Sequence, residues 1–164
     1  MTVIADESDV HDIGGIMGGE HSGVTESTTD IVIESAYFSP QGIGATGRKL
    51  GLTSDARSRF ERGVDPAFLE GGMALATHMV LDICGGEPSR VIAAGKTPVP
   101  DKVVAYDPAL TEKLAGIAVD TARQQTILTS LGFTVTAGTA WQIGVPSWRR
   151  DIDGPADIVE EVVR

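Results

Sequence analysis

A proline-containing connector divides this chain and limits how it can fold. The stretch Gly95-Lys96-Thr97-Pro98-Val99-Pro100 places two prolines within three residues. Proline lacks a backbone N–H donor and fixes φ, so neither a helix nor a central strand runs easily through such a stretch. We therefore predict a domain boundary here, with a first domain at residues 1–97 and a second at residues 98–164.

The first predicted domain is rich in glycine turns. Short strands are predicted at residues 2–5, 31–36 and 89–94, and Ile31-Val32-Ile33 is typical of a largely buried strand. A helix is predicted from Pro66 to Cys84, with Asp65 as its N-cap and Gly85-Gly86 as its end. Its core-facing side is expected to hold Leu69, Met73, Ala76, Val80, Ile83 and the lone cysteine, Cys84.

The second predicted domain alternates strands and helices. A strand is expected at residues 102–106, a helix opening at Asp107-Pro108 and another capped by Asp120. Two strands at 133–136 and 141–145 then form a hairpin. Two helices followed by a hairpin suggest a small winged-helix-like α+β plan. The last run, 157–164, has a helical pattern without an end cap, so the chain is expected to be truncated there.

The charge balance excludes several classes of protein. The 164 residues carry a formal charge of −10, which opposes long-range attraction to nucleic-acid phosphates. No uninterrupted apolar run approaches the roughly 18 residues needed to span a bilayer, and a single cysteine excludes an internal disulfide, so we expect a cytoplasmic protein. One short stretch of this acidic chain is basic, and its side chains are expected either to contact a polyanion or to pair with nearby acids. This basic island consists of Arg48, Lys49, Arg57, Arg59 and Arg62.

Three patterns in the first domain could support chemistry. Glu34 ends a predicted buried strand, where a charge is costly unless it is paired, used or turned to solvent. Gly14-Gly15 and Gly18-Gly19 form either a loop that approaches a ligand or two tight turns. Residues 42–47 match G-x-G-x-x-G, but Gly51 interrupts the helix that a dinucleotide site requires. The three histidines are too scattered in sequence to define a metal site.

The densest acidic cluster lies near the end of the chain. Several carboxylates close together can bind a hard cation such as Mg²⁺, or they can stabilise a helix N-terminus through the helix dipole without any metal. The candidate ligands are Asp151, Asp157, Glu160 and Glu161.

Four segments together resemble one family, the β subunit of bacterial phenylalanyl-tRNA synthetase. These segments are GGIMGGEHSGV (14–24), IESAYFSP (33–40), TSDARSRFERGVDP (53–66) and PSWRRDIDGPADIVEEVVR (146–164). Their order and spacing match along the whole chain. The family's β subunit is several times longer, so the resemblance implies an internal fragment: the C-terminal part of an α/β tRNA-editing domain, followed by a winged-helix-like domain.

The resemblance also implies roles for particular residues. Glu34 matches the carboxylate that recognises the phenol of tyrosine mischarged onto tRNA(Phe), and a buried acceptor discriminates strongly against phenylalanine. Gly18, Ser54 and Ala56 match small pocket residues, although Ser54 stands where a threonine is usual. The upstream half of the editing domain, with its histidines, is missing, so the isolated fragment is expected to be inactive.

The remaining implications concern the parent enzyme. The acidic cluster matches a Mg²⁺ site at the contact with the α subunit, in an α2β2 heterotetramer that charges tRNA(Phe). ATP-dependent aminoacylation belongs to the α subunit. The second domain's 6 basic against 9 acidic residues argue against autonomous DNA binding. The alternative is a purely structural interaction module without activity of its own.

Overall fold

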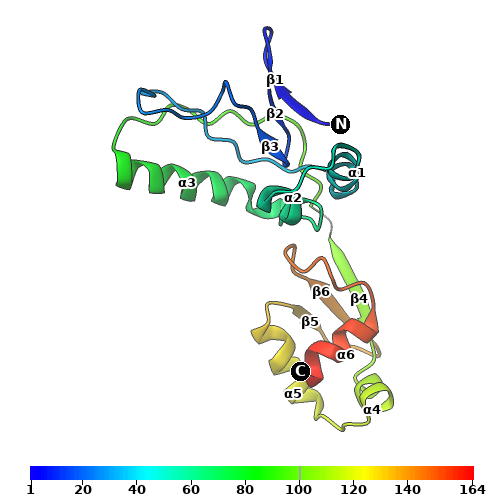
Figure 1. Cartoon of the computed structure of the whole chain (residues 1–164). Coiled ribbons are helices and arrows are strands. Elements are labelled where there is room, and N and C mark those ends of the chain that lie inside the picture. Colours follow the sequence, from blue (N-terminus) through cyan, green and yellow to red (C-terminus); the bar gives the residue numbers. More distant parts are fainter. Residues whose placement is uncertain (100) are drawn as a thin grey trace. The chain divides into compact units, whose positions relative to one another are not determined.

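The computed structural model describes residues 1–99 and 101–164, which form two compact units, Met1–Thr97 and Pro98–Arg164 (Figure 1). Pro100, the last residue of the expected connector, lies outside the described residues. Each unit contains one three-stranded antiparallel sheet, and the described residues add six α-helices. The expected mixed α/β composition is therefore confirmed.

The sheet of the first unit consists of β1 (Val3–Ala5), β2 (Val10–Ile13) and β3 (Met17–Gly18), in that order. The turn between β2 and β3 requires glycine. Gly15 has φ +68°, and a Cβ there would lie 2.8 Å from the Phe38 ring. The turn can therefore lie directly against the aromatic side chain, which a larger residue would push away.

Helices α1 (Pro40–Leu50) and α2 (Asp55–Phe60) follow from local signals. Ser39 caps the start of α1, and Gly51 ends it with a left-handed conformation. The G-x-G-x-x-G pattern lies inside α1, so its rejection as a dinucleotide turn is confirmed. A Cβ on Gly47 would lie 2.1 Å from Arg57 Nε, so glycine lets the Arg57 side chain lie against the α1 backbone.

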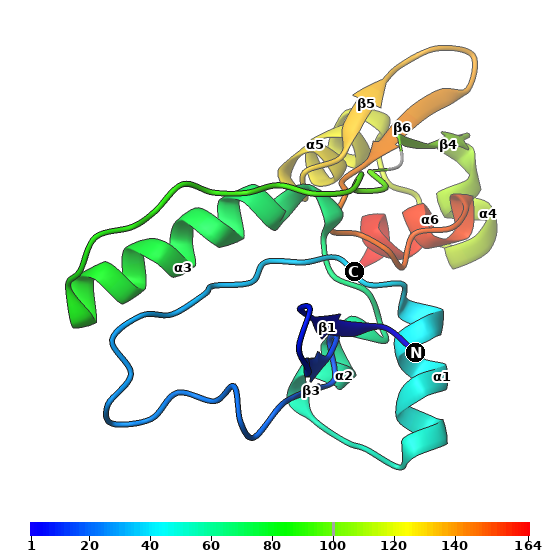
Figure 2. The ribbon, with the colours of Figure 1, turned by 90° about the horizontal axis from the view of Figure 1, so that it is seen from above.

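Helix α3 (Leu69–Cys84) follows a 3-10 turn at Pro66–Phe68, and Asp65 caps that turn as predicted. The predicted burial of its apolar side is wrong, because no residue of α3 is buried and Cys84 is exposed. Among the described elements, only the 3-10 turn packs closely on α3, and the views in Figures 1 and 2 show no helix or sheet layer along it. An amphipathic pattern produces burial only where a second layer covers it.

One helix in the described part of the chain, Pro66–Cys84, is long and apolar enough by length and composition to cross a membrane. The sequence analysis expects no membrane-spanning segment, because Glu70, His78 and Asp82 interrupt the apolar run in this helix. Its mean hydropathy over the best window is nevertheless 1.3. Many helices of soluble proteins satisfy the same criterion, so this one is weak evidence for a membrane.

Two predicted strands of the first unit are wrong. Residues 31–36 and 89–94 are extended but belong to neither sheet of the described chain. Val32 is 97% exposed and Ile92 is 77% exposed. A strand requires a neighbour for its backbone hydrogen bonds, and the described residues provide none beside either segment.

The second unit follows its sequence signals closely. Its elements are β4 (Lys102–Tyr106), α4 (Ala109–Ala115), α5 (Thr121–Ser130), β5 (Thr134–Thr136), β6 (Trp141–Val145) and α6 (Pro155–Val163). The sheet order is β4-β6-β5, so the predicted hairpin is completed by the first strand. Asp120 caps α5 through its side chain, as expected. Asp107 precedes α4, whose N-cap is Pro108, and accepts the Ala109 N–H.

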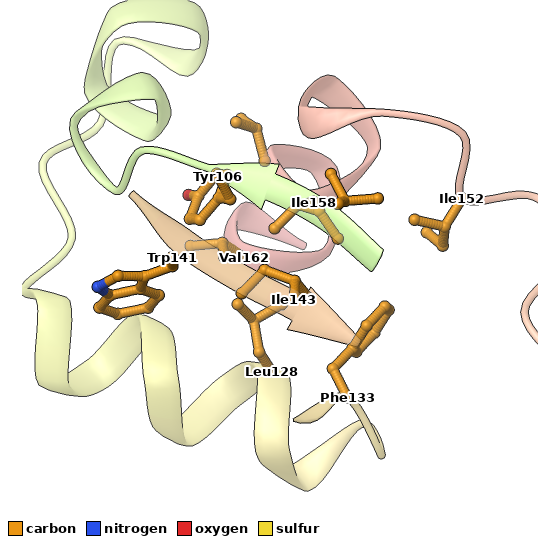
Figure 3. Close-up of a cluster of buried hydrophobic side chains, with 10 residues drawn as sticks. Tyr106, Leu128, Phe133, Trp141, Ile143, Ile152, Ile158 and Val162 are labelled. Atoms are coloured by element: carbon orange, nitrogen blue, oxygen red, sulfur yellow. The ribbon is translucent and has the colours of Figure 1, made fainter. Parts of the chain in front are cut away.

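The core of this unit lies between the sheet and its helices (Figure 3). Ile143 on β6 and Tyr106 on β4 are almost fully buried, as are Leu128 on α5 and Ile158 on α6. Alternation along β6 turns Trp141 and Ile143 to the same face, which is the face that these helices cover.

A buried polar network lies beside this core. The Tyr106 hydroxyl donates to Gln124 Oε1 at 2.7 Å, and Thr111 Oγ1 is hydrogen-bonded to the same two groups. Gln124 Nε2 donates to the carbonyls of Pro108 and Val119 at 3.1 and 2.9 Å. Gln124 therefore joins β4, α4 and α5 through its side chain, with both ends of its amide satisfied.

We predict that Gln124→Met lowers the free energy of unfolding by roughly 2 kcal/mol or more, because buried carbonyls and hydroxyls lose their partners. Chemical denaturation of the chain measures this. Gln125→Met is the matched control, since the neighbouring glutamine is exposed. Equal effects of the two substitutions would contradict the role assigned to Gln124.

Candidate functional site

The first unit contains a pocket of about 230 Å³. Its walls come from the β2–β3 turn, the extended segment before α1, and α2. The lining residues are Asp12, Ile13, Gly15, Ile16, Met17, Gly18, Glu34, Ala36, Phe38, Ala56 and Phe60. The volume lies below the 300–1,000 Å³ common for drug-sized ligands, which suits a single amino-acid side chain.

Three of the four residues predicted for the editing pocket line this one. Gly18 ends β3, Glu34 lies in the extended segment, and Ala56 lies in the first turn of α2. These positions are distant in sequence, and the fold brings them to one cavity. The fourth residue, Ser54, lies behind the wall instead of lining it.

Ser54 connects two walls of the pocket. Its Oγ donates to the Ile16 carbonyl at 2.5 Å and accepts from the Arg57 backbone N–H at 3.0 Å. The first bond holds the β2–β3 turn, and the second caps α2. The hydroxyl therefore fixes the separation between the turn and the helix that carries Ala56.

One side of the pocket is aromatic. The rings of Phe38 and Phe60 lie edge to face, with centroids 5.2 Å apart. Ser35, next to Glu34, donates its hydroxyl to the Leu69 carbonyl at 2.9 Å and so ties the extended segment to the start of α3. Glu34 thus lies next to this tie, although its segment is not a strand. The expectation of a buried acceptor is wrong, because the Glu34 residue is exposed.

Glu34 is the one glutamate of the pocket, and its carboxylate forms no ion pair or hydrogen bond with any described residue. Partial desolvation in the pocket and then the negative charge of Asp12 raise the pKa of Glu34 above its usual value. Asp12 is held differently, because its Oδ1 accepts from the Gly19 N–H at 3.0 Å. The pocket therefore presents an unpaired hydrogen-bond acceptor beside aromatic walls.

The predicted metal residues of the second unit have other partners. Arg149 donates from Nε and Nη2 to Asp151 at 2.9 and 2.6 Å, and from Nη1 and Nη2 to Glu161 at 2.9 and 2.8 Å. The guanidinium also lies 5.5 Å from the centroid of the Phe133 ring. These bonds hold the pKa of Asp151 and of Glu161 below their usual values.

Asp157 serves as a helix cap. Its Oδ2 accepts from the N–H groups of Asp153 and Gly154 at 2.7 and 2.8 Å, which lowers its pKa. Glu160 is exposed one turn further along α6. Across the described residues, no group of three or more histidine, cysteine, aspartate or glutamate side chains is arranged to hold a metal. In this conformation the four carboxylates therefore do not fit a magnesium ion.

One residue of the basic island is paired within the first unit, and the other four are exposed to solvent. Arg57 is bound to Glu61 at 3.0 Å and to the Leu52 carbonyl. The other four residues of the island are exposed: Arg48, Lys49, Arg59 and Arg62.

Sequence reasoning missed two features of the first unit. Asp12 lines the pocket, and His11 lies against His21, although the histidines were expected to be scattered. Both features depend on how the hairpin folds back, which no spacing rule predicts for a turn of this kind.

Comparisons with known proteins agree with this arrangement. Residues 1–85 match the family model of the B3/4 domain, and residues 104–164 match that of the tRNA synthetase B5 domain. The two units are therefore modules of the kind found in aminoacyl-tRNA synthetases.

Curated relatives extend the match to the whole chain. The phenylalanine–tRNA ligase beta subunit of Novosphingobium aromaticivorans is 58% identical over 164 residues, and that of Zymomonas mobilis is 51% identical. Each match covers 100% of this chain and 20% of the relative. The corresponding subunit of Paramagnetospirillum magneticum is 51% identical, with 21% of it covered. The chain belongs to the phenylalanine–tRNA ligase beta subunit family and spans about a fifth of the length of these relatives.

We predict that Arg149→Met lowers the free energy of unfolding at neutral pH by about 3 kcal/mol, because Glu161 is buried and would lose its counter-charge. The substitution should also make the free energy of unfolding depend less on pH in the acidic range. Asp151 and Glu161 have lower pKa values in the folded chain than the roughly 3.9 and 4.3 of unfolded chains. The unfolded chain thus binds more protons below about pH 5, and the wild-type stabilisation is lost as the pH falls.

Denaturation at a series of pH values tests both parts of this prediction. Arg123→Met, which removes an exposed arginine of α5, is the matched control. Retention of the wild-type stability and acid dependence in Arg149→Met would refute it.

Proposed function

We propose that the first unit contributes the amino-acid pocket for hydrolytic editing of tyrosyl-tRNA(Phe). The observation that carries this proposal is that Glu34, Gly18 and Ala56 line one small pocket. Membership of the phenylalanine–tRNA ligase beta subunit family supports it. The printed names of the relatives state the ligase, and the editing role is our inference from the pocket.

The unpaired carboxylate explains how such a pocket would select its substrate. A tyrosyl side chain lying beside Phe38 and Phe60 would direct its phenol toward the Glu34 carboxylate, which accepts a hydrogen bond from the hydroxyl. Phenylalanine fills the same space but leaves the partly desolvated carboxylate without a donor. A site built to bind a hydroxyl rejects the analogue that lacks it, because the acceptor then stays unsatisfied.

Hydrolysis would depend on positioning. The described lining contains two carboxylates but no serine, cysteine or histidine side chain that could act as a nucleophile. Water attacks the ester carbonyl, the ester bond breaks, and the terminal ribose hydroxyl of the tRNA and free tyrosine are released. Gly18 and Ala56 leave space for the ester and the water beside it, so orientation supplies the rate enhancement.

Exposed basic residues suit the approach of the tRNA. Arg48 and Lys49 end α1, and Arg59 and Arg62 lie at the end of α2 and just after it. The surrounding chain is acidic, so these four cations form a local contact for phosphates and do not make the whole unit a nucleic-acid binder.

For the second unit we propose a scaffold role in a cytoplasmic α2β2 enzyme. Its two helices followed by a hairpin suit the winged-helix-like plan. In the parent enzyme, ATP-dependent charging of tRNA(Phe) would take place on the α subunit. A purely structural module without editing is the second candidate. The ion pairs of Arg149 with Asp151 and Glu161 suit it, because they give these two carboxylates a structural role within the unit.

The editing proposal predicts the effect of Glu34→Ala in a full-length beta subunit assembled with its α partner. We expect the rate of tyrosyl-tRNA(Phe) hydrolysis to fall roughly 10–100-fold, because the substitution removes one hydrogen bond to a charged group. Phenylalanyl-tRNA(Phe) should be hydrolysed as slowly as before. Glu26→Ala, which removes an exposed glutamate outside the pocket, should leave both rates unchanged.

Deacylation assays on both esters decide between the candidates. Selective clearance of the tyrosyl ester that is lost only in Glu34→Ala supports editing by this pocket. Clearance that survives Glu34→Ala with its selectivity intact refutes the role of Glu34, and a wild-type enzyme that clears neither ester favours the structural module.

A magnesium ion on Asp151, Asp157, Glu160 and Glu161 stays a prediction that depends on the α subunit. Because Arg149 already forms ion pairs with both Asp151 and Glu161, we expect the chain alone to bind Mg²⁺ at least tenfold more weakly than the assembled enzyme does. Calorimetric titration of both, with Glu160→Gln and Glu161→Gln as variants, measures this. Equal affinity in the two states would contradict it.

A further inference from the structure

Two histidines meet on the β2–β3 hairpin, outside the pocket lining. His11 lies in β2, and His21 lies in the loop that follows β3. His11 Nδ1 and His21 Nε2 form a hydrogen bond at 3.2 Å, and the ring centroids are separated by 5.2 Å. The hairpin therefore directs two imidazole nitrogens at each other across ten residues of sequence.

This separation suits two ligands of one metal ion. Zinc–nitrogen bonds measure about 2.0–2.1 Å, so two nitrogens at a tetrahedral angle lie roughly 3.3–3.4 Å apart. Neutral imidazole is a preferred ligand of divalent zinc, copper and nickel. The observed distance differs from the tetrahedral one by little more than a tenth of an ångström, so small ring movements would admit an ion.

Asp6 provides the supporting contact that metal-binding histidines usually have. Its Oδ2 lies 3.0 Å from His11 Nε2, on the side of the ring opposite His21. A proton on Nε2 that is donated to this carboxylate leaves the Nδ1 lone pair to accept the Nε2–H of His21, and a metal ion would displace that shared proton. Asp6 is itself fixed, because its Oδ1 accepts from the N–H groups of Ser8 and Asp9 at 2.7 and 2.9 Å, and these bonds lower its pKa.

The backbone around the pair is held in place without a metal. Ser22 Oγ donates to the carbonyls of His11 and Gly19, each at 3.3 Å. A Cβ on Gly19 would lie 2.1 Å from the His11 carbonyl oxygen, so only glycine lets the loop return this close to β2. The two rings are thus brought together by the hairpin, and an ion would find its ligands already arranged.

We infer that His11 and His21 form a site for one divalent transition-metal ion such as Zn²⁺, oriented by Asp6. Since the described residues offer no group of three or more protein ligands, water completes the coordination. The ion would fasten β2 to the loop after β3. Because that loop follows Met17 and Gly18 of the pocket wall, occupancy would stabilise the hairpin from which the pocket is built.

Zn²⁺ titration of the full chain by calorimetry tests this inference independently of any editing activity. We expect one ion per chain, with affinity reduced at least tenfold in His11→Asn and in His21→Asn. Asp6→Asn should weaken binding roughly 10–100-fold, as the loss of such a supporting carboxylate does. His78→Asn is the matched control, because His78 is exposed on α3 and should not affect binding.

Proton NMR of the wild-type chain keeps the test valid if a variant fails to fold. The chain has three histidines, so their ring signals can be assigned directly. Stoichiometric Zn²⁺ should shift two of them and leave His78 unchanged. A wild-type chain that binds no Zn²⁺, or a folded His21→Asn variant that binds it with wild-type affinity, would overturn the inference.

Discussion

The shape of the first unit's pocket depends on the hydroxyl of Ser54. That hydroxyl donates to the β2–β3 turn through the Ile16 carbonyl and accepts the Arg57 N–H in the first turn of α2. A single hydrogen bond contributes only about 0.5–1.5 kcal/mol to stability. Its geometric effect is larger, since it determines how far the turn lies from Ala56. The bond requires only the hydroxyl oxygen and hydrogen of Ser54, so the small serine side chain is sufficient for this effect.

The two units maintain their shapes by different means. The second has a cluster of ten buried apolar residues around β6 and a satisfied polar network beside it. In the first, Ile16 and Ile43 are the large apolar side chains that are fully buried among the described residues. It relies instead on helix caps, on polar ties such as Ser35 to Leu69, and on glycines that allow close approach.

This contrast explains what the sequence could predict. The strand at residues 102–106, the helix that opens after Asp107-Pro108, the Asp120 cap and the hairpin are confirmed, because local signals and tertiary packing agree there. The strand at 31–36 and the burial of Cys84 are wrong, because both require a neighbouring layer that the pattern itself cannot supply. The resemblance placed Glu34, Gly18 and Ala56 together, and the structure gives them a common cavity. Asp12 and the histidine pair depend on the path of the hairpin.

The carboxylates of this acidic chain differ in the direction of their pKa shifts, and the difference follows from their hydrogen-bond partners. Asp151, Asp157 and Glu161 have lowered pKa values because an arginine or backbone N–H groups stabilise their charges within the fold. The pKa of Glu34 shifts the other way, since it is partly desolvated, faces Asp12 and has no donor among the described residues. A fold gains nothing in stability from such a group. Glu34 is also exposed to solvent, so its carboxylate is free to accept a hydrogen bond from a bound ligand, and a pocket lined by two phenylalanine rings suits the aromatic hydroxyl that we propose.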